Sequence, residues 1–386
     1  MKFIVYLGVV SMFADMTYEG AHSIIGPFLK DLGASATQVG LVAGFGEMCA
    51  ASLRLFSGRF ADRTRAYWSI CIFGYAVNLI VVPALAFAGS WQIAALLLIA
   101  ERIGKSLRGP ARDVLLSEAT GTVGHGWGFG VHAAFDQTGA VLGPLMVAAA
   151  VAQSNHFGPA FLRLGIPAAA ALIALLVARA IHPKVIAVSD LESKNSVLPR
   201  VFWYYVAAAG LLACGFVDFP LLAYHFQKTA LLKPATIPLL YAGAMAMNGV
   251  TALLFGRLFD RYGIAVLAFG IVLSAAALPL GFLGGPSAIV ASILFWGLGI
   301  GAQDACLRSG IAQVVSMNKR GAAFGMFNAV YGVMWFIGSA AMGLLYDHSL
   351  LALVAFGVTG QVSAAAMFLW VRRPLMLAAF GRQGTS

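Results

Sequence analysis

Stretches of about twenty or more mostly apolar residues recur along nearly the whole chain, and this repetition limits the fold more than any other feature. A helix of that length crosses the hydrocarbon core of a bilayer. The sequence therefore predicts an all-α integral membrane protein with twelve transmembrane helices. The twelve stretches are 3–29, 37–58, 67–88, 91–117, 127–152, 158–181, 201–227, 236–257, 264–283, 287–315, 321–346 and 350–372.

Charge supports this assignment. Only 10% of the 386 residues are charged, whereas a soluble domain carries about 25%. The net charge of +10 could indicate a nucleic-acid partner, but the basic residues crowd into alternate loops, such as 59–65 and 179–200. By the positive-inside rule both termini are then cytoplasmic. We expect a monomer in the bacterial inner membrane, in contact with lipids and not with nucleic acid.

Nothing in the sequence indicates a cofactor or a metal. The four cysteines stand alone within apolar segments, and the seven histidines lack metal-binding spacing. The glycine-rich runs 126–130 and 297–301 follow no strand, so helix packing explains them better than phosphate binding. No nucleophile–base pair and no soluble domain is recognisable, which argues against an enzyme and against a sensor.

The chain repeats itself. Gly58-x-x-x-Asp62-Arg63 recurs 198 residues later at 256–261, each copy following an apolar stretch. A polar segment at 182–200 interrupts the pattern half-way. We therefore predict a six-helix bundle at 1–181, a cytoplasmic linker at 182–200 and a second bundle at 201–386. Two parallel halves around a central cleft are typical of a secondary transporter.

These residues carry a resemblance to the major facilitator superfamily, over all twelve spans. Residues 58–65 resemble the superfamily signature between helices 2 and 3, although 64–66 depart from it, and the copy at 256–263 keeps the second glycine. Gly139-Ala-Val-Leu-Gly143-Pro144 is similar to a helix-5 signature found mainly in its proton-driven exporters. The resemblance implies two pseudo-symmetric six-helix bundles that rock about a central site.

The signature residues are expected to form a cytoplasmic gate. Glycines at 58 and 256 permit close helix approach, and the aspartates at the helix ends can accept hydrogen bonds from a facing helix N-terminus. The alternative is that these loop charges only set topology. The predicted gate comprises Gly58, Asp62, Arg63, Arg112, Asp113, Asp136, Asp260 and Arg261.

Charges within the spans mark the interior. Glu101, Lys105, Arg108 and Arg112 lie on one helical stripe that begins half-way through the fourth span. Each charge costs roughly 2.5–3.5 kcal/mol at the bilayer centre, so the stripe must face water or partners. The resemblance implies that helices 1, 4, 7 and 10 line the cleft, where the other interior charges fall. Substrate-cleft candidates are Tyr18, His22, Lys105, Arg108, Arg308 and Trp335.

A carboxylate in a partly dry cleft can take up and release protons near neutral pH. Asp15 and Glu19 are the leading proton-site candidates, since no basic residue is adjacent to them in sequence. The alternative is that they are permanently paired with Lys105 or Arg108. The other candidates are Glu101, Asp218 and Asp304.

Two functions fit these features. The helix-5 signature favours proton-coupled antiport, by which a small organic molecule leaves the cell. The basic residues of the cleft favour proton-coupled symport, by which a small anionic or zwitterionic metabolite enters. The sequence leaves the direction and the substrate open.

Overall fold

The computed structural model describes residues 2–120, 125–182, 198–315 and 319–383. All regular secondary structure in these residues is helical. Most of the linker predicted at 182–200 lies outside them. The helices are α1 (Lys2–His22), α2 (Ile25–Asp31), α3 (Ala36–Thr64), α4 (Tyr67–Ala84), the short 3-10 helix η1 (Leu85–Phe87), α5 (Trp91–Thr120), α6 (His125–Ser154), α7 (Gly158–Arg163), α8 (Gly165–Ile181), α9 (Arg200–Gly215), α10 (Phe219–Thr229), α11 (Thr236–Tyr262), α12 (Ala265–Ala275), α13 (Ala277–Leu283), α14 (Pro286–Val314), α15 (Arg320–His348) and α16 (Leu350–Gln383).

Ten helical segments among the described residues are long and apolar enough to cross a membrane. They match ten of the twelve predicted spans. The remaining two predictions, 3–29 and 91–117, correspond to α1–α2 and to α5. Asp15 and Glu19 lower the mean hydropathy of α1, and α5 carries four charged residues between Glu101 and Arg108. The chain is therefore a multi-pass membrane protein, and the two helices outside the criterion are those with the most interior charge.

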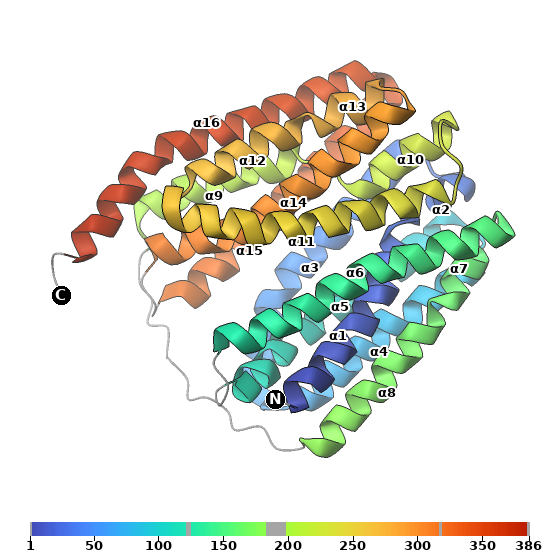
Figure 1. The fold of residues 1–386 in the computed structure, drawn as a ribbon, viewed down its shortest axis with the longest axis horizontal. Coiled ribbons are helices and arrows are strands. Elements are labelled where there is room, and N and C mark those ends of the chain that lie inside the picture. Colours follow the sequence, from blue (N-terminus) through green and yellow to red (C-terminus); the bar gives the residue numbers. More distant parts are fainter. Residues whose placement is uncertain (1, 121–124, 183–197, 316–318, 384–386) are drawn as a thin grey trace.

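The helices form two groups, α1–α8 (blue to green) and α9–α16 (yellow-green to red), which lie on opposite sides of the molecule in Figure 1. The end of α8 identifies one face of the molecule. There the ring of Phe3 lies 4.4 Å from the ring of His182, and Trp68 Nε1 donates to the His182 carbonyl at 3.0 Å. We call this face the linker side and the opposite face, where α2 packs on α10, the far side.

The two groups meet through four helix pairs among the described residues: α3 with α15, α6 with α11, α2 with α10 and α3 with α10. Small residues allow this approach: a Cβ at Gly40 would lie 2.3 Å from the Ser339 carbonyl oxygen. At the far side Thr37 Oγ1 donates to Asp347 at 2.6 Å. The contacts of α2 with α10 and of Thr37 with Asp347 close the far side, and the two groups diverge towards the linker side in Figure 1.

The predicted span 201–227 is not one continuous helix. Helix α9 ends at Gly215, and α10 begins at Phe219 after extended backbone at Phe216 and Asp218. Pro220 in the first turn of α10 has no N–H to continue a helix from α9. The break places Asp218 at the N-cap of α10, in the interior of the molecule.

The helix-5 signature packs α6 against α1. A Cβ at Gly139 would lie 2.2 Å from the carbonyl oxygen of Met12, and one at Gly143 would lie 2.2 Å from that of Met16. The backbones therefore touch at two points one helical turn apart. The glycines act here as spacers between helices, as expected for small residues in membrane helix pairs.

We predict that Gly143→Ala destabilises the protein by roughly 1–3 kcal/mol, because the added methyl group must push α1 away. The matched control is Gly130→Ala in the same helix, where no described atom lies within 4 Å of the new Cβ. Thermal unfolding of the purified proteins in detergent measures the difference. Equal melting temperatures for the two variants would show that the α1–α6 contact is not tight.

Candidate functional site

A cavity of about 430 Å³ lies between the two groups of helices. It is lined by α1, α3, α5, α11, α14 and α15, and by Asp218 from the break before α10. Helices α3, α11 and α15 therefore join the cleft helices expected from the sequence. Predicted site residues that line the cavity are Tyr18, Glu19, His22, Lys105, Asp218, Asp304, Arg308 and Trp335.

The end of the cavity nearest the far side is acidic and aromatic. The buried Asp218 carboxylate accepts a hydrogen bond from Trp335 Nε1 at 3.3 Å and lies 3.9 Å from His22 Nε2. Glu19 accepts a hydrogen bond of 2.5 Å from the Tyr241 hydroxyl. Both the Glu19–Tyr241 and the His22–Asp218 contacts join α1 to the second group of helices, so this end of the cavity is closed.

The end nearest the linker side carries two arginines, Arg54 from α3 and Arg308 from α14. Arg308 is exposed, as is Asp304 one turn before it, and Asp304 accepts a hydrogen bond from Asn248 at 3.4 Å. The two guanidinium groups line the same cavity although they come from different halves of the chain. We call this end the mouth, because the two groups of helices separate here.

The strongest ion pairing in the site belongs to Arg102, which the stripe of α5 did not include. Its guanidinium lies 2.9 Å from Glu47 of α3 and 3.5 Å from Glu101. It also donates to the Tyr18 hydroxyl and lies 3.1 Å from His22 Nδ1, both on α1. Arg102 thus ties α1, α3 and α5 together behind the cavity wall.

The predicted stripe divides between two environments. Lys105 reaches the cavity, where its ammonium lies 3.2 Å from the centre of the Tyr18 ring. Glu101 instead turns to α4 and accepts a hydrogen bond from Asn78. Lys105 is therefore the stripe residue that lines the cavity, whereas Glu101 lies behind the cavity wall together with Arg102.

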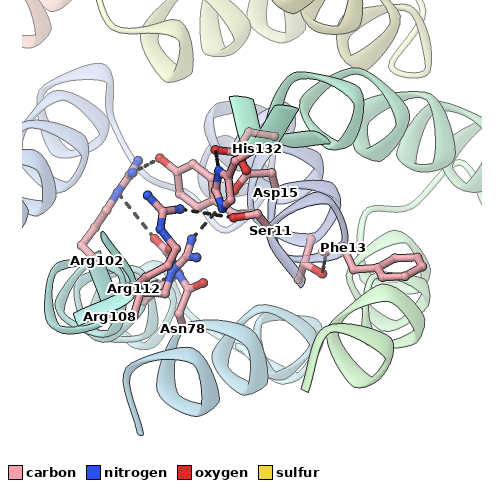
Figure 2. Close-up of polar contacts among 12 residues, drawn as sticks. Ser11, Phe13, Asp15, Asn78, Arg102, Arg108, Arg112 and His132 are labelled. Carbon is pink, nitrogen blue, oxygen red and sulfur yellow. Dashed lines mark hydrogen bonds and ion pairs between the residues drawn. The ribbon is translucent and has the colours of Figure 1, made fainter. Parts of the chain in front are cut away.

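Arg108 and Arg112 lie within the first group of helices and not on the cavity wall (Figure 2). Arg108 is buried 3.8 Å from Asp15 and 4.3 Å from the centre of the Tyr75 ring. Arg112 lies 3.0 Å from Asp113 and donates to Ser11 at 3.2 Å. In the same region Asp136 lies 3.3 Å from His132 on α6.

The Asp15–Arg108 pair supports the alternative that Asp15 is an ion-pair partner. For Glu19, no ion pair is found among the described residues.

The other gate residues are exposed or loosely packed. Asp62 accepts a hydrogen bond from the neighbouring Tyr67 at 3.2 Å, while Arg63, Asp260 and Arg261 are exposed. Their role in closing the linker side stays a prediction.

Sequence reasoning left out several residues of the site. Arg102 was not among the predicted site residues, although a further charge in an apolar span is itself a signal of burial against partners. Glu47 and Arg54, seven residues apart on one face of α3, carried the same signal. Within the part of the chain that the structure describes, no group of three His, Cys, Asp or Glu side chains is placed to hold a metal ion.

A membrane-spanning helical chain with a charged cavity between two groups of helices has the architecture of a secondary transporter. The sequence model of the Major Facilitator Superfamily matches residues 7–229 and 219–382, and the chain belongs to this superfamily. The resemblance inferred from the signatures is thereby confirmed. The protein is a transporter of the superfamily and not an enzyme.

An uncharacterised protein of Mycobacterium tuberculosis is 39% identical over 382 residues, which cover 97% of this chain and 93% of the relative. An uncharacterised MFS-type transporter of Methanocaldococcus jannaschii is 23% identical over 389 residues, covering 96% and 95%. Among solved structures, peptide transporter POT in complex with sulfate has a TM-score of 0.77 at 12% identity, over 98% of this chain and 95% of that one. At 12% identity, the similarity to this solved structure shows the fold alone.

We predict that Arg102→Met lowers the free energy of unfolding by about 3–5 kcal/mol, because Glu47 and Glu101 lose their buried counter-charge. Thermal unfolding in detergent measures the loss, with the exposed Arg59→Met as the matched control. Adding Glu47→Gln to Arg102→Met should recover part of the stability. Additive losses in the double variant would mean that the two side chains do not interact.

Proposed function

We propose that this transporter moves a small organic molecule bearing an anionic group, coupled to protons. One observation carries the proposal. Arg54, Lys105 and Arg308 line the cavity, and none of the three has an ion-pair partner among the described residues. The cavity therefore offers cationic groups that no carboxylate of the described residues holds in a salt bridge.

Uncompensated cations in a membrane interior are costly, so a site retains them where a bound anion supplies the missing charge. Arginine suits this task because its planar guanidinium binds a carboxylate or phosphate with two parallel hydrogen bonds. Arg54 and Arg308 approach the mouth from opposite halves of the chain. An anion held between them would bring the two halves together.

Asp304 is the carboxylate best placed to couple this site to protons. It lies one helical turn from Arg308 and is hydrogen-bonded by Asn248, a neutral group. Protonation of Asp304 removes a negative charge beside Arg308 and so strengthens anion binding. By linkage, a bound anion favours proton uptake to the same extent. Proton and anion then prefer to occupy the cavity together, which is the requirement for symport.

Antiport is the second candidate, favoured by the helix-5 signature at 139–144. In that mechanism the proton and the substrate occupy the cavity in turn, and the substrate leaves the cell. In both mechanisms the twelve helices form two pseudo-symmetric bundles, 1–181 and 201–386, joined by the linker at 182–200. Both termini and the mouth are then cytoplasmic, in the inner membrane of a prokaryotic cell, and the gate residues close the mouth when the far side opens.

Purified protein in liposomes loaded with a pH-sensitive dye tests the proposal. Pools of organic acids, phosphate esters, amino acids and amine drugs are added outside, and Arg54→Gln/Arg308→Gln serves as the blank. We expect an anionic pool to acidify the lumen, since substrate and protons enter together. Lumenal alkalinisation would establish antiport. A response confined to the amine drugs, or one retained by the double variant, would contradict the anion assignment.

We predict that Asp304→Asn abolishes accumulation driven by a pH gradient while counterflow exchange of labelled substrate continues. Counterflow needs no net proton movement, so an uncoupled carrier still performs it. Glu19→Gln is the comparison, since Glu19 lines the same cavity and also has one neutral hydrogen-bond donor. If Glu19→Gln uncouples and Asp304→Asn does not, the proton site lies at the closed end. Equal loss of both activities would make Asp304 a binding or structural residue.

A further inference from the structure

We infer that the substrate is an extended zwitterion, with an ammonium group held at Asp218 and its anionic group at Arg54 and Arg308. This inference rests on the proposed function and names the substrate class. The carrying observation is that the two ends of the cavity hold groups of opposite charge that are in no salt bridge with a lysine, an arginine or a carboxylate among the described residues. Asp218 lies at the closed end with Glu19, and the two arginines lie at the mouth with Asp304.

Asp218 has the features of a ligand-binding carboxylate. It occupies the N-cap of α10, where an aspartate usually accepts hydrogen bonds from the next backbone N–H groups. Its side chain makes no such bond. It lines the cavity instead, although it is buried. Among the described residues no lysine or arginine pairs with it, and its one ionic neighbour is His22 at 3.9 Å.

The walls around Asp218 suit an ammonium group. Trp335 donates to the carboxylate, and its indole stands 5.8 Å from Phe216 and from Tyr331, measured between ring centres. Trp296 and Tyr241, 6.1 Å apart, line the same part of the cavity. Aromatic faces attract cations through their quadrupoles, most strongly where water is displaced. A carboxylate surrounded by tryptophan and tyrosine rings is therefore a site for a substrate amine.

The protein provides its own example of this chemistry nearby. The Lys105 ammonium lies 3.2 Å from the centre of the Tyr18 ring, and both residues line the cavity. Of the two carboxylates at the closed end, Glu19 accepts a short hydrogen bond of 2.5 Å from Tyr241, whereas Asp218 accepts a longer one of 3.3 Å from Trp335. Asp218 is therefore the carboxylate left for an external amine.

The distance between the two ends sets the length of the substrate. On α14 twelve residues separate Trp296 at the closed end from Arg308 at the mouth, which is a rise of about 18 Å. Helical side chains lean towards the N-terminus of their helix, and for α14 this points Arg308 back into the cavity. The amine and the anion are therefore separated by on the order of 10 Å, which exceeds the charge separation in an α-amino acid.

Isothermal titration calorimetry of the full-length protein in detergent tests this inference with ω-amino acids of three to eight carbons. The central set is 6-aminohexanoate, N-acetyl-6-aminohexanoate, which keeps only the anion, and hexylamine, which keeps only the amine. We expect 6-aminohexanoate to bind about tenfold or more tightly than either analogue, because each loses one charged contact. Affinity should also rise with chain length. Equal affinity of 6-aminohexanoate and its N-acetyl analogue, or no binding by any ω-amino acid, overturns the inference.

Two variants separate this inference from the proposed function. In Asp218→Asn the amide oxygen can still accept the Trp335 hydrogen bond, yet 6-aminohexanoate should bind no better than its N-acetyl analogue. The control, Asp31→Asn, removes an exposed far-side carboxylate and should change neither affinity. An Asp218→Asn protein that keeps the full preference for 6-aminohexanoate overturns the inference, whereas the proposed function fails if Arg308→Gln leaves binding of the N-acetyl analogue unchanged.

Discussion

Compensation of charge at Arg102 is the interaction on which the rest of the site depends. A guanidinium within a bundle of membrane helices is tolerable only when carboxylates and acceptors surround it. Here Glu47 and Glu101 supply the charge, and Tyr18 and His22 supply further contacts. These residues belong to α1, α3 and α5, so pairing fixes three cavity helices relative to one another.

Glu47 and Glu101 balance the charge of Arg102. The other charged residues of the cavity are therefore not needed for this and can bind a substrate. The mouth holds Arg54 and Arg308 with Asp304, and the closed end holds Asp218 and Glu19. Asp218 and the two arginines would pair if they could reach one another. The helices prevent this, since residues on a rigid helix stay at the height where the sequence puts them. The cavity thereby keeps an electrostatic gradient along its length.

The sequence predicted most of the fold, because the length of an apolar stretch and a signature motif can each be read within a single segment. Ten of the twelve predicted spans are long and apolar enough to cross a membrane, and the signatures led to the correct superfamily. The site was less predictable. A stripe such as 101–112 shows that a helix has a charged face, but not how that face is rotated against its neighbours. Glu101 accepts a hydrogen bond from Asn78 on α4, and of the four stripe residues it is Lys105 that lines the cavity.

Contacts between residues far apart in the sequence could not be predicted from residue spacing within one helix. Glu19 and Tyr241 are 222 residues apart in sequence, and no periodicity within either helix connects them. The break before α10 was also not predicted, because 201–227 is mostly apolar, even though Pro220 marks where a helix can begin.

The break and the cross-chain contacts together explain how binding could be linked to movement. The closed end is held by neutral glycine contacts between helices and by two polar contacts, Glu19–Tyr241 and His22–Asp218. Both polar contacts use carboxylates that line the cavity. A cation bound there competes with Tyr241 or His22 for the same oxygen atoms, which weakens the closure of the far side. An anion bound between Arg54 and Arg308 draws the mouth together. Occupation of both ends by one molecule therefore favours closing the linker side and opening the far side, and the segregated charges provide the coupling.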